Sequence, residues 1–209
     1  CSPAGNDLLF DENLTEQGRN FSNKIWNAFR LVNGWQVDGA IGQPEHARLA
    51  VEWFDAILDK TIEQVNQHFD AYNVSEALMV VYKLFWDEFS SWYLEAVKPG
   101  FNQPIDKATF EATIGYFEKL LKLLHPYMPF ITEEIYHLIA AREEGDCIMV
   151  SQLPMPKPYS AELIDEFENL KETVANIRAI RQDKNIPHKD ALELFVKREG
   201  KLAVDLSSV

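Results

Sequence analysis

The sequence predicts a mainly α-helical protein, a bundle of helices followed by a short, truncated α/β tail in the form of a β-hairpin. Three observations lead to this fold class. Apolar residues recur at helical spacing through most of the 209 residues, Pro and Gly interrupt them at intervals that suit helix ends, and the period falls to two only past residue 188. A bundle of this length can bury a core without disulfides or metals.

The first predicted helix covers residues 12–33 and has one apolar face. Five residues at spacings of seven, four, three and four form that face: Leu14, Phe21, Ile25, Ala28 and Val32. Gly18 lies on the same face, so we expect another helix to approach closely there. Asn33-Gly34 is expected to end the helix.

Two long helices are predicted next. Pro44 suits the first turn of a helix that runs to about Tyr72, with Tyr72 facing inward. Ser75 is the expected N-cap of a helix that ends before Pro99. Its inward stripe is Leu78, Tyr82, Phe85, Phe89, Trp92 and Ala96. Aromatic residues at helical spacing indicate a core rather than a base-stacking platform.

A helix capped by Asp106 leads into a rigid corner between Pro126 and Pro129. We expect Thr132 to cap the following helix, which runs from 133 to about 143 and stops at Gly145. We expect His125 to bind the backbone of the corner.

The remainder contains an expected extended piece at Cys147–Val150, then a stiff connector with prolines at 154, 156 and 158. Ser160 should cap a last helix that ends at Ile186-Pro187. We therefore divide the chain into a leader at 1–11, a helical domain at 12–188, and the start of a small module at 189–209, where Leu192, Leu194 and Val196 alternate as in a strand.

Composition excludes several classes of protein. The net charge of −13 argues against a non-specific nucleic-acid binder, so an RNA contact must use a local basic patch. Two cysteines without CxxC spacing indicate a reduced, cytoplasmic protein. No apolar run is long enough for a membrane span, and the first residue is Cys, so we expect an internal piece of a larger soluble protein.

Catalytic and metal-binding motifs are lacking. The sequence has no P-loop, GxGxxG, HExxH or EF-hand loop, so we assign no catalytic residue and no cofactor to this chain. Glu134 and His137 match half of a di-iron Glu-x-x-His pair, but no second copy exists. We therefore predict no metal site.

Basic residues gather in two places. On the first helix the cations Arg19, Lys24 and Arg30 alternate with the amides Asn20, Asn23 and Asn27, opposite the apolar face. Guanidinium, ammonium and amide groups can bind phosphates and base edges. The second group, Arg178, Arg181, Lys184 and Lys189, lies at the end of the last helix, where cations also stabilise the helix dipole. Either role is open for this group.

Several segments resemble the anticodon-binding region of class I aminoacyl-tRNA synthetases. LLHPYMPFITEEIY (123–136) is similar to a signature of the valine, isoleucine and leucine group. The valine-specific members are most similar at RNFSNKIWNAFR (19–30), WDEFSSWYLEAVKP (86–99) and NIRAIRQDKNIP (176–187). SPAGNDLLFDE (2–12) resembles the segment that follows their KMSKS loop.

The resemblance implies a part of a valine–tRNA ligase that binds the anticodon arm of tRNA(Val). The whole enzyme would use ATP and Mg to attach valine, while this chain lacks the HIGH and KMSKS motifs and should be inactive alone. It implies that Lys24 reads the anticodon, supported by contacts from Arg19, Asn23, Asn27 and Arg30, with Arg178 and Arg181 as further candidates. Expected partners are tRNA(Val) and the rest of the synthetase, without membrane contact, in a monomeric enzyme.

The sequence departs from the family pattern at two positions, and two alternatives stay open. Leu31 stands where the family usually has Phe, which weakens the expectation of base stacking there, and Ser90 replaces a frequent Cys as a small core change. The alternatives are the equivalent domain of an isoleucine- or leucine-type synthetase, and a helical scaffold that binds a protein and no RNA.

Overall fold

The structure is a computed structural model that describes residues 12–187 and residue 190. It divides into two compact units, Cys1–Tyr159 and Ser160–Val209. Helices dominate both described parts, which confirms the mainly α fold class. No helix within the described residues is both long and apolar enough to cross a membrane. The expected leader at 1–11 and the strand-like tail fall outside the described residues.

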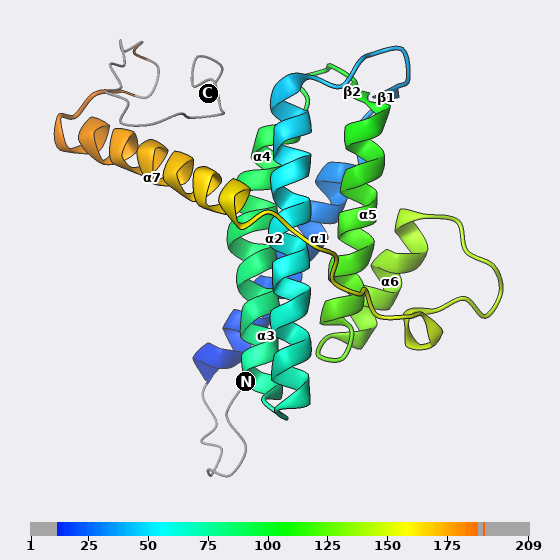
Figure 1. Ribbon diagram of the computed structural model, residues 1–209. Coiled ribbons are helices and arrows are strands. Elements are labelled where there is room, and N and C mark those ends of the chain that lie inside the picture. Colours follow the sequence, from blue (N-terminus) through cyan, green and yellow to red (C-terminus); the bar gives the residue numbers. More distant parts are fainter. Residues whose placement is uncertain (1–11, 188–189, 191–209) are drawn as a thin grey trace. The chain divides into compact units, whose positions relative to one another are not determined.

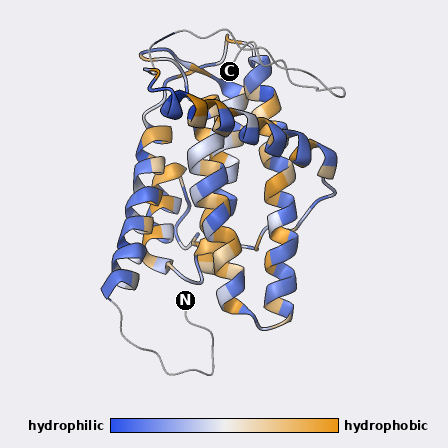
Figure 2. Ribbon diagram, turned by 90° about the vertical axis from the view of Figure 1, so that its left-hand side faces the viewer, coloured by the Kyte–Doolittle hydropathy of each residue, from blue (hydrophilic) through white to orange (hydrophobic). Residues whose placement is uncertain are grey.

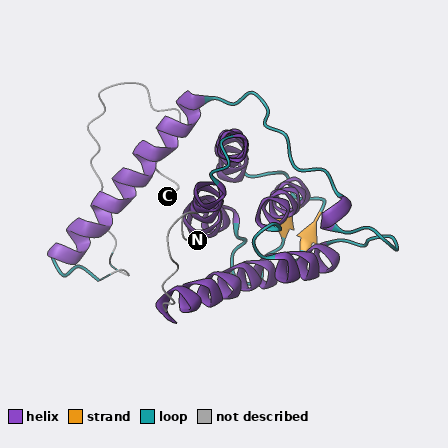
Figure 3. Ribbon diagram, turned by 90° about the horizontal axis from the view of Figure 1, so that it is seen from below, coloured by secondary structure: helices purple, strands orange, loops and turns teal. Residues whose placement is uncertain are grey.

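The first unit is a helical bundle (Figure 1). Its helices are α1 (Glu12–Asn33), α2 (Glu45–Asp70), α3 (Val74–Lys83), the π-helix η1 (Leu84–Tyr93), α4 (Leu94–Val97), α5 (Lys107–Leu124), α6 (Pro129–Ile139) and the 3₁₀ turn η2 (Ile148–Val150). Viewed from below, the long helices of the bundle appear nearly end-on and α1 lies across them (Figure 3). The contacts of α1 are mainly with α6 and η1.

Aromatic side chains from three helices fill the centre of the bundle. The Phe54 ring on α2 lies 5.3 Å from Phe89, 4.8 Å from Tyr93 and 4.9 Å from Tyr116, between ring centroids. Hydrophobic and hydrophilic stretches alternate along the bundle helices in Figure 2, as expected for helices with one buried face. The prediction that Phe85 and Phe89 belong to the core is confirmed, since both are fully buried.

Two inward-facing positions were predicted wrongly. Tyr72 is 90% exposed, because α2 ends at Asp70 and the chain turns at Tyr72 with φ 59°. Gly18 is exposed, and a Cβ added there would meet no atom within 4 Å. The expected close helix contact at Gly18 is therefore absent from the described residues.

The expected helix from 75 to 98 is three helical segments in direct succession. Asn73 precedes α3 in place of the expected cap Ser75, and α3 passes into the ten-residue π-helix η1 before α4 resumes α-helical geometry. A π-helix bonds residue i to i+5, so it changes which side chains lie above one another. Periodicity at 3.6 residues does not predict such a change.

Two short strands connect parts of the chain that the sequence did not pair. Strand β1 (Val37–Asp38) runs parallel to β2 (Ile105–Asp106), and Ile105 N donates to Gln36 O at 2.8 Å. We call this pairing the β1–β2 clip. Because β1 follows α1 and β2 follows α4, the clip joins the ends of these two helices. Asp106 also caps α5 as predicted, its carboxylate accepting from Thr109 N at 2.8 Å.

The corner after α5 differs from the expected geometry. Helix α6 begins at Pro129, so Thr132 lies inside the first turn and is not the N-cap. Pro at the first helical position loses no hydrogen bond and has its φ preset, which explains the earlier start. The Thr132 hydroxyl instead donates to Met128 O at 2.9 Å and lies 2.9 Å from His125 Nδ1. His125 thus binds a side chain of the corner, where a backbone partner was expected.

Replacing Thr132 with Val is expected to lower the free energy of unfolding by about 1–3 kcal/mol, because it removes a fully buried hydroxyl and leaves its partners unsatisfied. Thermal denaturation followed by circular dichroism measures the change. Thr132→Ser, which keeps the hydroxyl, is the matched control and should cost less. Equal losses for both variants would mean that the hydroxyl contributes no more to stability than the γ-methyl group.

Helix α6 also ends earlier than predicted, at Ile139 instead of about 143. Arg142 folds back to donate to Tyr136 O at 3.2 Å and to Glu118 at 3.0 Å, which satisfies a carbonyl of the last turn. The expected extended piece at Cys147–Val150 is instead η2, a single 3₁₀ turn. Its first amide, Ile148 N, donates to the Glu133 carboxylate at 3.1 Å.

The connector before the second unit is anchored to α2. Lys157 N donates to Asp59 at 3.1 Å, and Tyr159 OH donates to Glu63 at 2.9 Å. In the second unit the described helix is α7 (Ala161–Asp183), with Ser160 as its cap as predicted, since the Ser160 hydroxyl accepts from Leu163 N at 3.2 Å. The helix ends before the expected Ile186-Pro187. The assignment of 12–188 to one helical domain remains a prediction.

Candidate nucleic-acid interface

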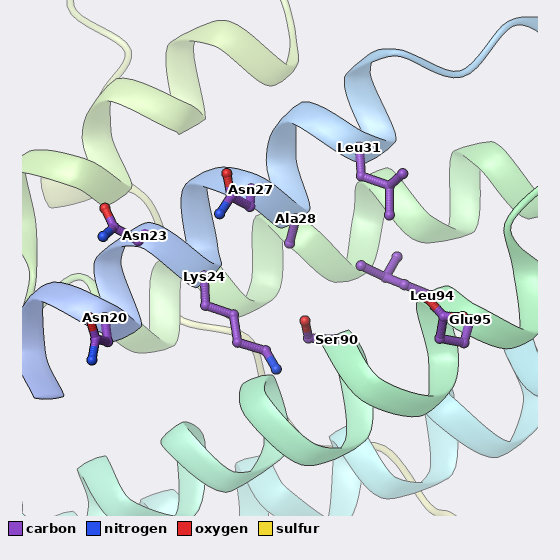
Figure 4. A pocket seen from close by; sticks show the side chains of 9 residues that line it. All are labelled: Asn20, Asn23, Lys24, Asn27, Ala28, Leu31, Ser90, Leu94 and Glu95. Carbon is purple, nitrogen blue, oxygen red and sulfur yellow. The ribbon is translucent and has the colours of Figure 1, made fainter.

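A pocket of about 450 Å³ lies between α1 and the run η1–α4. It is open to solvent and collects residues from two segments that are distant in sequence. Its lining is Asn20, Asn23, Lys24, Asn27, Ala28 and Leu31 from α1, with Ser90, Leu94 and Glu95 from the other wall. Figure 4 shows Lys24 extending from α1 toward the helix that carries Ser90. The β1–β2 clip joins the two walls beyond Leu31 and Leu94.

Lys24 is the cation of this pocket. Its Nζ lies 4.2 Å from the ring centroid of Trp86 and donates to Ser91 Oγ at 3.5 Å. Burial lowers the pKa of Lys24 below its usual 10.5, and the nearby Asp87 carboxylate opposes this shift. An ammonium that is partly removed from water binds an acceptor more strongly than an exposed one, because less hydration is lost on binding. Lys24 is thus placed to bind an acceptor in the pocket.

The aromatic ring beneath Lys24, that of Trp86, is itself packed against two other aromatic rings. Trp86 stacks on Tyr82 with centroids 5.5 Å apart and planes 20° apart. Phe21 of α1 lies 4.7 Å from Tyr82 and 6.2 Å from Trp86, between centroids. These rings fix α1 against α3 and η1, so the pocket wall that carries Lys24 is held by the core.

The remaining lining has an apolar part and a polar part. Ala28, Leu31 and Leu94 form the apolar part, and Leu31 faces Leu94 in Figure 4. Leu31 therefore supplies an apolar surface even though it is not aromatic. Ser90 is half-buried and lines the pocket, so its expected role as a core position is wrong.

The amides on α1 are available for a ligand. Asn20, Asn23 and Asn27 are exposed, and no hydrogen bond of their side chains to another described residue is found. Each amide offers two donors and one acceptor. Glu95, from the opposite wall, adds a carboxylate acceptor that pairs with Lys98. The pocket thus combines donors, acceptors and an apolar wall.

The other sequence-predicted contacts do not meet in this pocket. Arg19 is exposed and pairs with Glu16 at 3.5 Å, and Arg30 is exposed outside the pocket lining. Arg178 and Arg181 belong to the second unit. Arg181 donates to Pro187 O at 2.9 Å and to Asp190 O at 3.0 Å, so its guanidinium holds the end of α7. Of the predicted residues, Lys24, Asn23 and Asn27 share the pocket.

The sequence did not single out the second wall as part of a site. Leu94 and Glu95 fall within the segment that resembles the synthetases, but their position beside Lys24 depends on how η1 and α4 pack against α1. Trp86 was also not named as a site residue. The sequence did hold a signal for both walls. Segments 19–30 and 86–99 each resemble the synthetases, and the structure brings these two segments together at the pocket.

Other polar clusters hold the fold together. Glu133 binds Ile148 N and His137 Nε2, and Arg142 binds Glu118 and Tyr136 O. In the part of the chain that the structure describes, no three His, Cys, Asp or Glu side chains are grouped so that they could hold a metal ion.

Comparison with known proteins gives a consistent result. Residues 51–196 match the family model described as the anticodon-binding domain of tRNA ligase. The chain is similar to the valine–tRNA ligase of Parabacteroides distasonis (60% identity over 95% of this chain and 23% of the relative). It is also similar to those of Porphyromonas gingivalis (52% identity, 98% and 23%) and Carboxydothermus hydrogenoformans (35% identity, 88% and 21%).

The chain spans less than a quarter of the length of these relatives. The family match begins at residue 51, so it includes η1 and α4 but leaves out α1 and therefore Lys24.

Proposed function

Because the chain belongs to the family of anticodon-binding domains of tRNA ligases, we propose that it recognises the anticodon arm of tRNA(Val) as part of a valine–tRNA ligase. The pocket between α1 and η1–α4 is the observation that links this function to particular residues. Sequence-specific RNA recognition targets unpaired bases, whose edges are then free for hydrogen bonds and whose faces are free for packing. Anticodon bases are of this kind.

The composition of the pocket favours a base over a phosphate. A phosphate is best bound by several cations, whereas this pocket holds one ammonium, Lys24, and also the Glu95 carboxylate, which repels phosphate. A nucleobase has an apolar face that suits Leu31 and Leu94. Its edge carries both donors and acceptors, which match the Asn amides, Lys24 and Glu95. We propose Lys24 as the principal base-reading group.

Arg19 and Arg30 take a different role in this proposal. Both are exposed on α1 outside the pocket lining, so they can reach the phosphates on either side of a bound base. Such contacts position RNA without reading its sequence. The acidic chain then binds RNA through a local surface and not through its net charge of −13.

The whole enzyme would attach valine to tRNA(Val) with ATP and Mg in the cytoplasm, acting as a monomer. The sequence lacks the HIGH and KMSKS motifs of the catalytic domain. In this proposal the chain contributes specificity and orientation, because gripping the anticodon arm places the distant acceptor end. The relatives described above are named valine–tRNA ligase, which favours this specificity over isoleucine or leucine.

The experiment that tests the proposal is binding of the 209-residue chain to an unmodified tRNA(Val) transcript, beside transcripts that differ only in one anticodon base. We expect the altered base to weaken binding by about 5- to 150-fold, since a lost base contact costs about 1–3 kcal/mol. Binding should also weaken as the salt concentration rises. In a plot of log affinity against log salt concentration, each phosphate contact should contribute a slope of about −0.7. Equal affinity for all transcripts would contradict anticodon recognition by this chain, and salt-insensitive association would favour a protein-binding scaffold.

A further inference from the structure

We propose that Trp86 and Ser91 are positioning residues that hold the Lys24 ammonium at the pocket before RNA binds. This inference rests on the proposed function, because it concerns how the base-reading cation is prepared. Neither residue needs to contact RNA. The proposal assigns a role to the π-helix η1, which the family match and the relatives do not describe.

A lysine on an exposed helix face is ordinarily mobile. Its four-carbon stem has many rotamers, and holding it in one of them costs conformational entropy at the moment of binding. Lys24 is instead in contact with two groups of the opposite wall, the Trp86 ring at 4.2 Å and the Ser91 hydroxyl at 3.5 Å. A cation over an indole face is attracted by the negative face of the ring. The side chain is therefore already ordered across the gap between α1 and η1.

The partners of Lys24 are fixed in turn. Trp86 stacks on Tyr82 and lies 6.2 Å from the ring of Phe21, so its free face points in one direction. The Ser91 hydroxyl donates to Trp86 O at 2.8 Å, which leaves its lone pairs to accept from Lys24. Both partners of the ammonium are thus held before any ligand arrives.

The π-helical geometry explains why these two residues can act together. Residues five apart in an α-helix are about 140° apart around its axis, given 3.6 residues per turn. The i to i+5 bonding of a π-helix places them about one turn above each other. Trp86 and Ser91 are five apart within η1, so the π-helix brings the ring and the hydroxyl to the same side. In an α-helical η1 only one of them could face Lys24.

The charges around Lys24 agree with this role. Asp87 from η1 and Glu95 from α4 are the acidic groups found near it among the described residues. The Nζ of Lys24 contacts Trp86 and Ser91, and within the described residues it forms an ion pair with neither carboxylate. An ammonium held by a ring and a hydroxyl stays available for an acceptor, whereas a direct ion pair would have to be broken first.

The test is a double-mutant cycle on the 209-residue chain with a tRNA(Val) transcript as the probe. Trp86→Leu removes the ring face and keeps an apolar side chain, whereas Trp86→Phe keeps a smaller ring. We expect Trp86→Leu to weaken binding about three- to ten-fold, in the range of an exposed to partly buried cation–π contact, and Trp86→Phe to restore most of the affinity. In the Lys24→Ala background, Trp86→Leu should have no further effect.

Two further measurements separate positioning from folding. Ser91→Ala changes an exposed hydroxyl and should weaken binding about two- to five-fold, again only when Lys24 is present. The pKa of Lys24, followed by NMR of its labelled side chain, should change in Trp86→Leu. It should stay the same in Trp26→Leu, the matched control, which removes an indole from α1 outside the pocket. A purely structural role of Trp86 would not move this titration.

The outcomes distinguish the two proposals. Equal losses for Trp86→Leu with and without Lys24 would overturn the positioning role, because the ring would then act on the fold or on RNA directly. If Lys24→Ala itself leaves binding unchanged, the proposed function of the pocket fails, and positioning fails with it. Loss with Lys24→Ala, together with coupling to Trp86, supports both.

Discussion

Replacing Lys24 with Ala will weaken binding of the tRNA(Val) transcript by about 10- to 100-fold, because a hydrogen bond to a charged group contributes about 1.5–3 kcal/mol. Lys24 is the pocket's ammonium, and the pocket lining holds no other Lys or Arg to replace it. The loss should be largest for the transcript with the valine anticodon and smaller for one with an altered base. Fluorescence anisotropy at fixed salt measures both affinities.

Arg30→Ala is the matched control for Lys24→Ala. It removes one positive charge from the same helix at an exposed position outside the pocket lining. We expect a loss of less than about 10-fold that is the same for both transcripts, as for a phosphate contact. If the two variants lose affinity to the same extent and without regard to the anticodon, Lys24 acts only as a charge, and the base-reading role is wrong.

Replacing Phe54 with Ala will lower the free energy of unfolding by about 3–5 kcal/mol, the range for truncating a buried aromatic residue. Phe54 is fully buried and its ring contacts Phe89, Tyr93 and Tyr116, so the loss affects α2, η1 and α5 together. Urea denaturation followed by circular dichroism measures the change. A loss of this size would be a large part of the stability of a typical domain.

Phe101→Ala is the control for Phe54→Ala. It removes the same side chain where the ring is 94% exposed, and its effect should stay within about 0.5 kcal/mol. A cost below about 1 kcal/mol for Phe54→Ala would mean that neighbouring helices collapse into the space that the ring leaves. The aromatic cluster would then not be the centre of the bundle's stability.

The sequence predicts those parts of the fold that depend on local signals. The helix over 12–33 ends at Asn33 as predicted, and Gly34 N donates there to Arg30 O at 3.2 Å. The caps Asp106 and Ser160 act as predicted because a cap needs only its own first turn. Thr132 shows the limit of this approach. It resembles a cap in sequence, but the helix starts at Pro129, four residues before the predicted start at 133, and leaves Thr132 to bind His125.

The site was predictable on one side only. The amides and cations of α1 are visible in sequence because they share one helix, and Lys24, Asn23 and Asn27 meet in the pocket. Glu95 and Leu94 complete the pocket from more than sixty positions away, and their approach depends on tertiary packing. The π-helix that aligns Trp86 with Ser91 is a departure from the period on which helix prediction relies.

The β1–β2 clip has a consequence for how the protein is made. Helix α1 leaves the ribosome well before residues 105–106, which the clip needs, have been synthesised. Local helices form quickly, whereas a pairing across such a long stretch of chain must pay for loop closure. During translation the apolar face of α1, with Phe21, Ile25 and Val32, stays uncovered until η1 and α6, which pack against this helix, have been synthesised. The pocket that we propose for reading the anticodon therefore forms late in folding, because its second wall, η1–α4, is synthesised well after α1.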